Sequence, residues 1–141
     1  MTKTITRAGL IGMFGGLVGV SLLGPAGPAE AHHSTAMFEW GKDSAPLQGT
    51  IVSFEWTQPH VWINFDVPNP KAEGGVDHYG IEGMSPSYLS RMGWSKRTLN
   101  AGEKVTMIIY PLKDGRKGGF CSKVILPDGK VLGNAPQRAP T

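Results

Sequence analysis

Apolar and polar residues alternate along several short segments of this chain, with the period of two that is typical of β-strands. The first such segment runs from Val52 to Trp56 and the second from Val61 to Val67, with Thr57-Gln58-Pro59-His60 between them. Pro59 has no backbone donor and restrains the residue before it. The four residues between the segments therefore predict a bend or bulge where the sheet changes direction.

Three more strands are expected further along the chain. One covers Val76–Glu82, after a loop marked by glycines, and the last covers Phe120–Leu126, between two Asp-Gly turn signals. The strand expected over Val105–Tyr110 is apolar on both faces, which predicts a place in the interior of the sheet.

One short helix is expected between the third and fourth strands. Ser85 is suited to the N-cap and Pro86 to the first helical position, and Gly93 is placed to end the helix after Met92. Three strands, a helix and two strands are the order of a five-stranded Greek-key barrel of the oligonucleotide/oligosaccharide-binding (OB) kind. An immunoglobulin-type sandwich would need about seven strands and usually no such helix.

The fold class expected is therefore mainly β with one short helix, in a small OB-like barrel. The barrel is predicted over residues 47–133, with an irregular N-terminal arm over residues 32–46 and a disordered tail over residues 134–141, which lacks periodicity.

The first 31 residues predict a cleavable secretory signal. Lys3 and Arg7 precede an apolar stretch, Ala8 to Leu23, and Ala29-Glu30-Ala31 places small residues where a signal peptidase requires them. The apolar stretch contains several glycines and is shorter than the about 20 residues of a membrane-spanning helix. We therefore expect cleavage before His32, a periplasmic location and no stable membrane anchor afterwards.

Charge and cysteine content narrow the function classes. The chain has 14 Lys and Arg against 11 Asp and Glu, and loss of the signal brings the two signs closer to balance. Nucleic-acid binding draws on a concentrated basic face, so nucleic acid is not expected as a partner. The single cysteine, Cys121, cannot form an intramolecular disulfide.

The histidines carry the clearest chemical signal. Cleavage would make His32 the N-terminal residue, whose α-amine and imidazole Nδ1 can bind one metal ion together. One further imidazole would complete a T-shaped nitrogen site suited to Cu(II), and His60, at the predicted bend, is the best candidate. His33 is a third, less suitable ligand. The alternative is that no metal binds, with His32 and His33 starting a polar arm and His60 hydrogen-bonded at its turn.

Aromatic and acidic residues offer a second candidate site. Trp62 is out of phase with Val61 and Ile63, so it is expected on the outside of the barrel as a stacking platform for a ligand or partner. Trp56 and Glu82 are further candidate contacts, with Glu82 expected on the solvent side of its strand. No nucleophile elbow and no phosphate-cradling glycine loop occur, which argues against an enzyme.

Several segments together resemble a known bacterial family. They are Ala31-His32-His33-Ser34, the run from Phe54 to Trp62, Ile81-Glu82-Gly83, Arg91 to Trp94, and Leu126 to Gly129. They are similar to the domain of unknown function 6152, a family of small exported proteins. Members usually have asparagine where this chain has Gln58. The resemblance implies an exported single-domain protein and supplies no activity.

Two main hypotheses follow for the function. The first is a periplasmic binding or accessory protein that binds Cu(II) through His32 and His60. The alternative is a metal-free module that docks a protein or glycan partner through Trp62 and the barrel face around it. An oxidase or oxygenase that uses the copper is a third, less favoured hypothesis.

Overall fold

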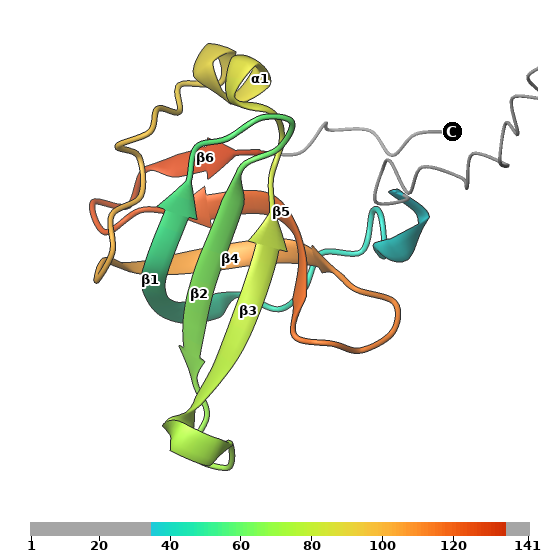
Figure 1. The fold of residues 1–141 in the computed structure, drawn as a ribbon. Helices are drawn as coiled ribbons and strands as arrows, with labels where there is room; N and C mark the ends of the chain where they lie inside the picture. The colour runs from blue at the N-terminus through green and yellow to red at the C-terminus, as the bar shows by residue number, and fades with distance from the viewer. Residues whose placement is uncertain (1–34, 135–141) are drawn as a thin grey trace, which may run out of the picture. The chain divides into compact units, whose positions relative to one another are not determined.

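The structure is a computed structural model that describes residues 35–134. The predicted signal, His32, His33 and residues 135–141 of the predicted tail lie outside this range. Within it, the chain forms the elements of Figure 1: β1 (Leu47–Glu55), β2 (Trp62–Pro68), β3 (Val76–Glu82), α1 (Pro86–Arg91), β4 (Lys104–Pro111), β5 (Gly118–Ile125) and β6 (Val131–Gly133). Two 3-10 turns, Thr35–Met37 and Glu73–Gly75, complete the set.

The first five strands close into a barrel. β1, β2 and β3 form an antiparallel meander, β1 also pairs with β4, and β4 pairs with β5. A parallel pairing between β3 and β5 closes the barrel. This is the strand order of an OB-type barrel with its helix between β3 and β4, so the predicted fold class is confirmed.

β6 is a short strand that the alternation pattern did not predict. It follows the turn at Asp128 and Gly129 and pairs with the end of β5. The next residue, Asn134, was assigned to the tail but is buried and hydrogen-bonded within the fold. A strand of three residues is too short to show an alternation of apolar and polar residues. β6 is therefore recognised by its pairing with β5 and not from its own sequence.

The barrel interior is filled by apolar side chains from every barrel strand. The most completely buried strand residues are Ile51, Ile63, Phe65, Ile81, Met107, Ile109 and Val124. In β1 the predicted phase is wrong at one position, because a bulge between Ile51 and Ser53 shifts the register with β2. Ile51 is therefore buried, whereas Val52, expected on the apolar side, is 49% exposed.

The helix forms as expected, across one end of the barrel (Figure 1). The Ser85 hydroxyl accepts a hydrogen bond from the Tyr88 backbone N–H at 3.3 Å, and Pro86 takes the first helical position. Leu89 is fully buried, so α1 places one apolar side chain into the core. Within residues 35–134, the structure contains no helix of the length and apolarity that crossing a membrane requires.

The predicted arm is irregular but packs on the barrel from residue 37 onward. The Lys113 N–H donates to the Met37 carbonyl at 3.0 Å, and the Glu39 N–H donates to the Pro111 carbonyl at 2.9 Å. The Phe38 ring is 4% exposed and lies edge-on to Phe120, with ring centroids 5.6 Å apart. These contacts anchor the arm beside the junction of β4 and β5.

Candidate functional site

The side chains of His60 and Glu82 are hydrogen-bonded to each other at one end of the barrel. His60 lies in the β1–β2 loop and Glu82 at the end of β3, and Nδ1 of the imidazole is hydrogen-bonded to Oε1 of the carboxylate. The His60 side chain is 44% exposed, whereas that of Glu82 is only 9% exposed. Because the carboxylate engages Nδ1, Nε2 is the ring nitrogen that remains for another ligand.

The burial of Glu82 corrects the expectation that it faces solvent. Alternation placed its side chain on the outside of β3, and the register agrees, because Glu82 lies opposite Trp62 on β2. The prediction of exposure is nevertheless wrong, since Glu82 is 7% exposed and its carboxylate contacts the His60 ring. A carboxylate this covered needs a partner, and His60 provides it.

Trp62 lies on the outside of the barrel and is 36% exposed. Its indole Nε1–H donates to Asn64 Oδ1 at 3.3 Å. Its six-membered ring lies against Gly80, because a Cβ on that glycine would be 2.7 Å from Cζ2 of the indole. A larger residue on β3 would displace the indole, so the glycine positions Trp62.

Trp56 has different surroundings. It is half-buried, packs against the edge of the core, and lies at a centroid distance of 5.7 Å from Phe54 in an edge-on arrangement. The structure therefore places Trp56 with the core residues of β1. Its predicted role as a ligand contact stays a prediction.

Two hollows on this side of the barrel share Gly80 as a wall. The first, about 210 Å³, is lined by Trp62, Glu82, Arg116 and the arm residues Met37 and Phe38. The second, about 320 Å³, is lined by residues of the middle of β2 and β3, among them Asn64, Asp66 and His78.

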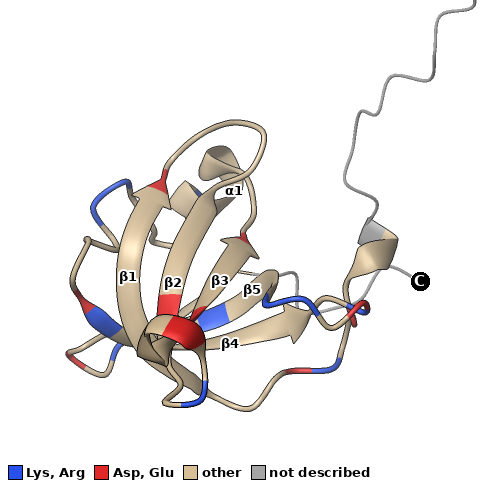
Figure 2. Cartoon of the chain, turned by 60° about the horizontal axis from the view of Figure 1, so that its bottom comes forward, with Lys and Arg blue, Asp and Glu red and all other residues tan. Residues whose placement is uncertain are grey.

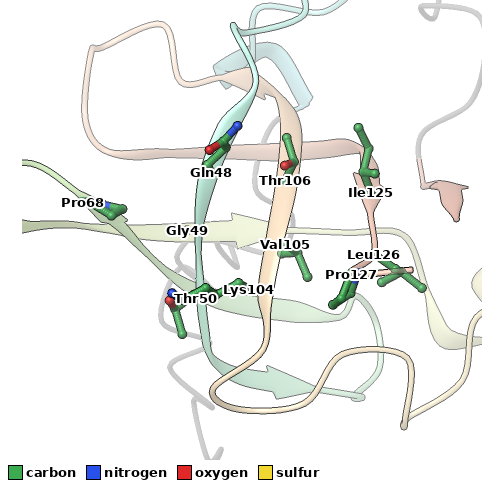
Figure 3. Close-up of a pocket in the computed structure, with 10 residues that line it drawn as sticks. All are labelled: Gln48, Gly49, Thr50, Pro68, Lys104, Val105, Thr106, Ile125, Leu126 and Pro127. Atoms are coloured by element: carbon green, nitrogen blue, oxygen red, sulfur yellow. The ribbon is translucent and has the colours of Figure 1, made fainter. Parts of the chain in front are cut away.

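A third hollow lies elsewhere and contains none of the candidate residues. It has a volume of about 500 Å³ and is lined from β1, β4 and the end of β5, with Gln48, Thr106 and Pro127 on its walls (Figure 3). Its one ionisable side chain is Lys104. With so few groups able to do chemistry, this hollow is a weaker candidate than the His60–Glu82 side.

Two residues on the candidate side were not singled out from the sequence. Asn64 links Trp62 to β1, since its Nδ2 donates to Ser53 Oγ at 2.7 Å. Arg116, from the β4–β5 turn, lines the smaller hollow, and its Nε donates to Asp114 at 2.7 Å. Asn64 could have been predicted, because it alternates with the buried Ile63 and Phe65 and so points outward from β2. Arg116 could not, because a basic residue in a turn is usually a solvent-exposed charge and nothing in the neighbouring sequence indicates otherwise.

A second histidine–carboxylate pair lies on the neighbouring part of the sheet. Nδ1 of His78 is 2.6 Å from Oδ1 of Asp66, across β2 and β3, and the His78 side chain is 75% exposed. It resembles the His60 pair chemically but belongs to the larger of the two hollows that share Gly80.

No cluster of three or more His, Cys, Asp or Glu side chains suited to a metal occurs within residues 35–134. The predicted copper site includes His32 and His33, which lie outside this range, so that site stays a prediction. Cys121 is not available as a ligand in the folded state, because full burial raises the pKa of its thiol to about 12.

Comparison with known proteins gives a family and no activity. Residues 20–122 match the family of unknown function DUF6152. The chain belongs to this family. No curated protein and no solved structure matches the chain. The match confirms the family resemblance and covers all of the sequence segments named for it except Leu126 to Gly129. It supplies no function for this DUF6152 protein.

Proposed function

We propose that this DUF6152 protein is exported to the periplasm and serves there as a binding or accessory protein that holds Cu(II) through His32 and His60. The observation that carries the proposal is the hydrogen bond between His60 Nδ1 and the nearly buried carboxylate of Glu82. Export and cleavage before His32 are supported by the signal-like sequence of the first 31 residues.

The pairing with Glu82 suits His60 to the role of a metal ligand. A carboxylate on one ring nitrogen fixes the tautomer, orients the ring and raises the basicity of the other nitrogen. Nε2 of His60 is then a pre-oriented ring nitrogen on a partly exposed side chain. Imidazole and amine nitrogens are donors that Cu(II) favours.

The anchored arm is long enough for His32 to reach His60. The Phe38 and His60 rings both lie against Phe120, with centroids 5.6 and 6.4 Å from it. The segment from Phe38 back to His32 can extend about 20 Å, which exceeds the sum of those two distances. The covalent chain is therefore long enough for the amine of His32 to reach His60.

Titration of the processed protein with Cu(II), followed by electron paramagnetic resonance, tests the proposal. We expect a nitrogen-rich type-2 signal at one equivalent, lost in His60→Ala and on addition of a methionine before His32, which moves the amine away. Glu82→Gln should weaken binding by about 10- to 100-fold.

His78→Ala is the matched control, because it removes another exposed histidine that is paired with a carboxylate. It should leave the spectrum unchanged. A copper spectrum that is the same in His60→Ala as in the parent protein would overturn the proposal.

A second function is favoured by Trp62, whose partly exposed indole borders the same hollow as Glu82 and Arg116. This is a docking surface for a partner, independent of metal. Trp62→Ala should then abolish retention of the partner from a periplasmic extract, while a chelator should have no effect. Retention that depends on metal and not on Trp62 would reject this second function.

A further inference from the structure

Three rows of side chains cross the outside of β1, β2 and β3, and we call this surface the outer face. In register, the rows are Glu55, Trp62 and Glu82; Ser53, Asn64 and Gly80; and Thr50, Asp66 and His78. The three strands lie side by side in Figure 1. One aromatic platform is thus surrounded by carboxylates, an amide and hydroxyls.

Hydrogen bonds hold the groups around the indole in place. Asn64 accepts from the indole of Trp62 and donates to Ser53 and, at 3.4 Å, to Glu55. Gly80 lies against the Cζ2 edge of the six-membered ring. Binding a ligand here therefore needs little ordering of side chains, which favours affinity.

The hollows on the two sides of Gly80 have volumes of about 210 and 320 Å³. Both lie at or below the lower end of the about 300–1,000 Å³ of small-molecule sites. Each therefore accommodates a small unit. A ligand that occupies both hollows is a chain of such units. It passes Trp62, because the indole borders the smaller hollow and its edge meets Gly80, the wall that the two hollows share.

The charge of the outer face distinguishes between an anionic chain of such units and a neutral one. Its three rows contain the carboxylates Glu55, Asp66 and Glu82 and no Lys or Arg, and acidic positions on all three strands are visible in Figure 2. The adjacent Arg116 is already paired with Asp114. Phosphates would be repelled here, whereas neutral hydroxyls can donate to the carboxylates.

We infer that the outer face binds a neutral oligosaccharide that spans both hollows, with one sugar ring stacked on Trp62. This inference names a ligand class for the docking function above and rests on that function, not on the copper site. Trp62 supplies the apolar platform for the C–H side of the ring. Glu82 and Asp66 accept from sugar hydroxyls on either side, and Asn64 holds the indole in place.

The test uses the full processed protein, labelled with ¹⁵N and kept in EDTA so that copper does not enter. Cellotetraose, chitotetraose and maltotetraose are titrated in turn, with oligothymidylate as the anionic comparison. We expect at least one tetrasaccharide to shift the Trp62 indole resonance and the amides of β2 and β3. Oligothymidylate should leave them unchanged.

Two variants test the geometry. Trp62→Ala removes the platform, and Gly80→Ala displaces the indole without deleting a side chain; each should lower the affinity about tenfold or more. The control is Val131→Ala on β6, which removes an apolar side chain that is 56% exposed and lies outside the outer face. It should bind as the parent does.

The inference is overturned if none of the three sugars shifts these resonances, if oligothymidylate binds this face more tightly, or if neither variant changes the affinity. Retention of a periplasmic protein that depends on Trp62, without sugar binding, would leave the docking function standing and remove only the ligand class. Loss of both would remove the docking function as well.

Discussion

Asn134 connects parts of the fold that are far apart in the sequence. Its side chain is 1% exposed, its Nδ2 donates to the Cys121 carbonyl at 2.6 Å, and its Oδ1 accepts from the Met84 N–H at 3.2 Å. The amide thus satisfies a carbonyl of β5 and an N–H of the segment that leads from β3 to α1. An aliphatic side chain of similar size could satisfy neither.

Asn134→Ala is therefore expected to lower the free energy of unfolding by about 2–3 kcal/mol, because two buried backbone groups lose their partner. Denaturant unfolding measures the loss. Gln48→Ala, which removes an exposed amide, is the control and should stay within about 0.5 kcal/mol of the parent. Equal stabilities for the two variants would show that water replaces the Asn134 amide.

Burial raises the pKa of the Cys121 thiol from 9.0 to about 12. The unfolded chain loses this proton at lower pH than the folded chain does, so the stability contributed by the neutral buried thiol is full below pH 9. It declines as the pH rises from about 9 towards 12. Cys121→Ala lacks this dependence.

We expect the difference in unfolding free energy between the parent and Cys121→Ala to shrink as the pH rises through this window. Chemical denaturation at a series of pH values measures it, and the comparison of two proteins cancels the titration of lysines and tyrosines. In the same window, thiol labelling of the folded protein should be slow and should become fast in denaturant. A difference that does not vary with pH would contradict the argument.

At the scale of elements, the barrel closes where β3 and β5 have small residues. Gly80 lies opposite Gly118 and Ile81 opposite Gly119 in the parallel pairing. A Cβ on Gly119 would lie 2.3 Å from the Tyr110 carbonyl oxygen, which belongs to the backbone and cannot move aside like a flexible side chain. The close approach of β4 to β5, the strand that also closes the barrel against β3, thus requires glycine at this position.

Gly119→Ala should cost about 2 kcal/mol or more of stability, because the clash forces β4 and β5 apart. Gly133→Ala on β6 is the matched control, since a Cβ there meets nothing within 4 Å. Thermal unfolding should therefore separate the two substitutions clearly. Closely similar midpoints would mean that the seam tolerates a side chain.

Most of the strands and the helix were predictable from the sequence, because in each of the longer strands apolar and polar residues alternate over enough positions to be recognised. β3 was expected over the residues that form it, and Ser85 and Pro86 marked the start of α1. The bulge in β1 was not predictable, since Ile51 and Val52 are equally apolar and only the pairing with β2 decides which is buried.

For the candidate site, the sequence predicted individual residues but not the contacts between them. His60 and Trp62 stood out because one sits at a bend and the other is out of phase with the core. The pairing of His60 with Glu82 and the placement of the Trp62 edge beside Gly80 depend on the register between strands and on a loop. No local pattern encodes these contacts, because their partners lie many residues apart.

At the scale of the whole molecule, the anchor of the arm links the fold to the proposed copper site. Phe38 and Trp40 both pack on Phe120, with centroids 5.6 and 5.0 Å from it, and the His60 ring contacts the same phenylalanine. If the proposed copper site forms, this anchor shortens the flexible chain between the barrel and His32. It then raises the effective concentration of the His32 amine at the His60 imidazole.

Phe38→Ala should consequently weaken Cu(II) binding although it removes no ligand. The released arm has a longer flexible segment to close, and the entropy of closure lowers the affinity. Competition with a chelator measures the change. Phe54→Ala is the control, because it removes a half-buried aromatic ring that packs on Trp56 and Trp94, away from the arm. Both variants should lose stability, but only Phe38→Ala should bind Cu(II) more weakly. Equal Cu(II) affinities in the two variants would show that the anchor stabilises the fold without contributing to metal binding.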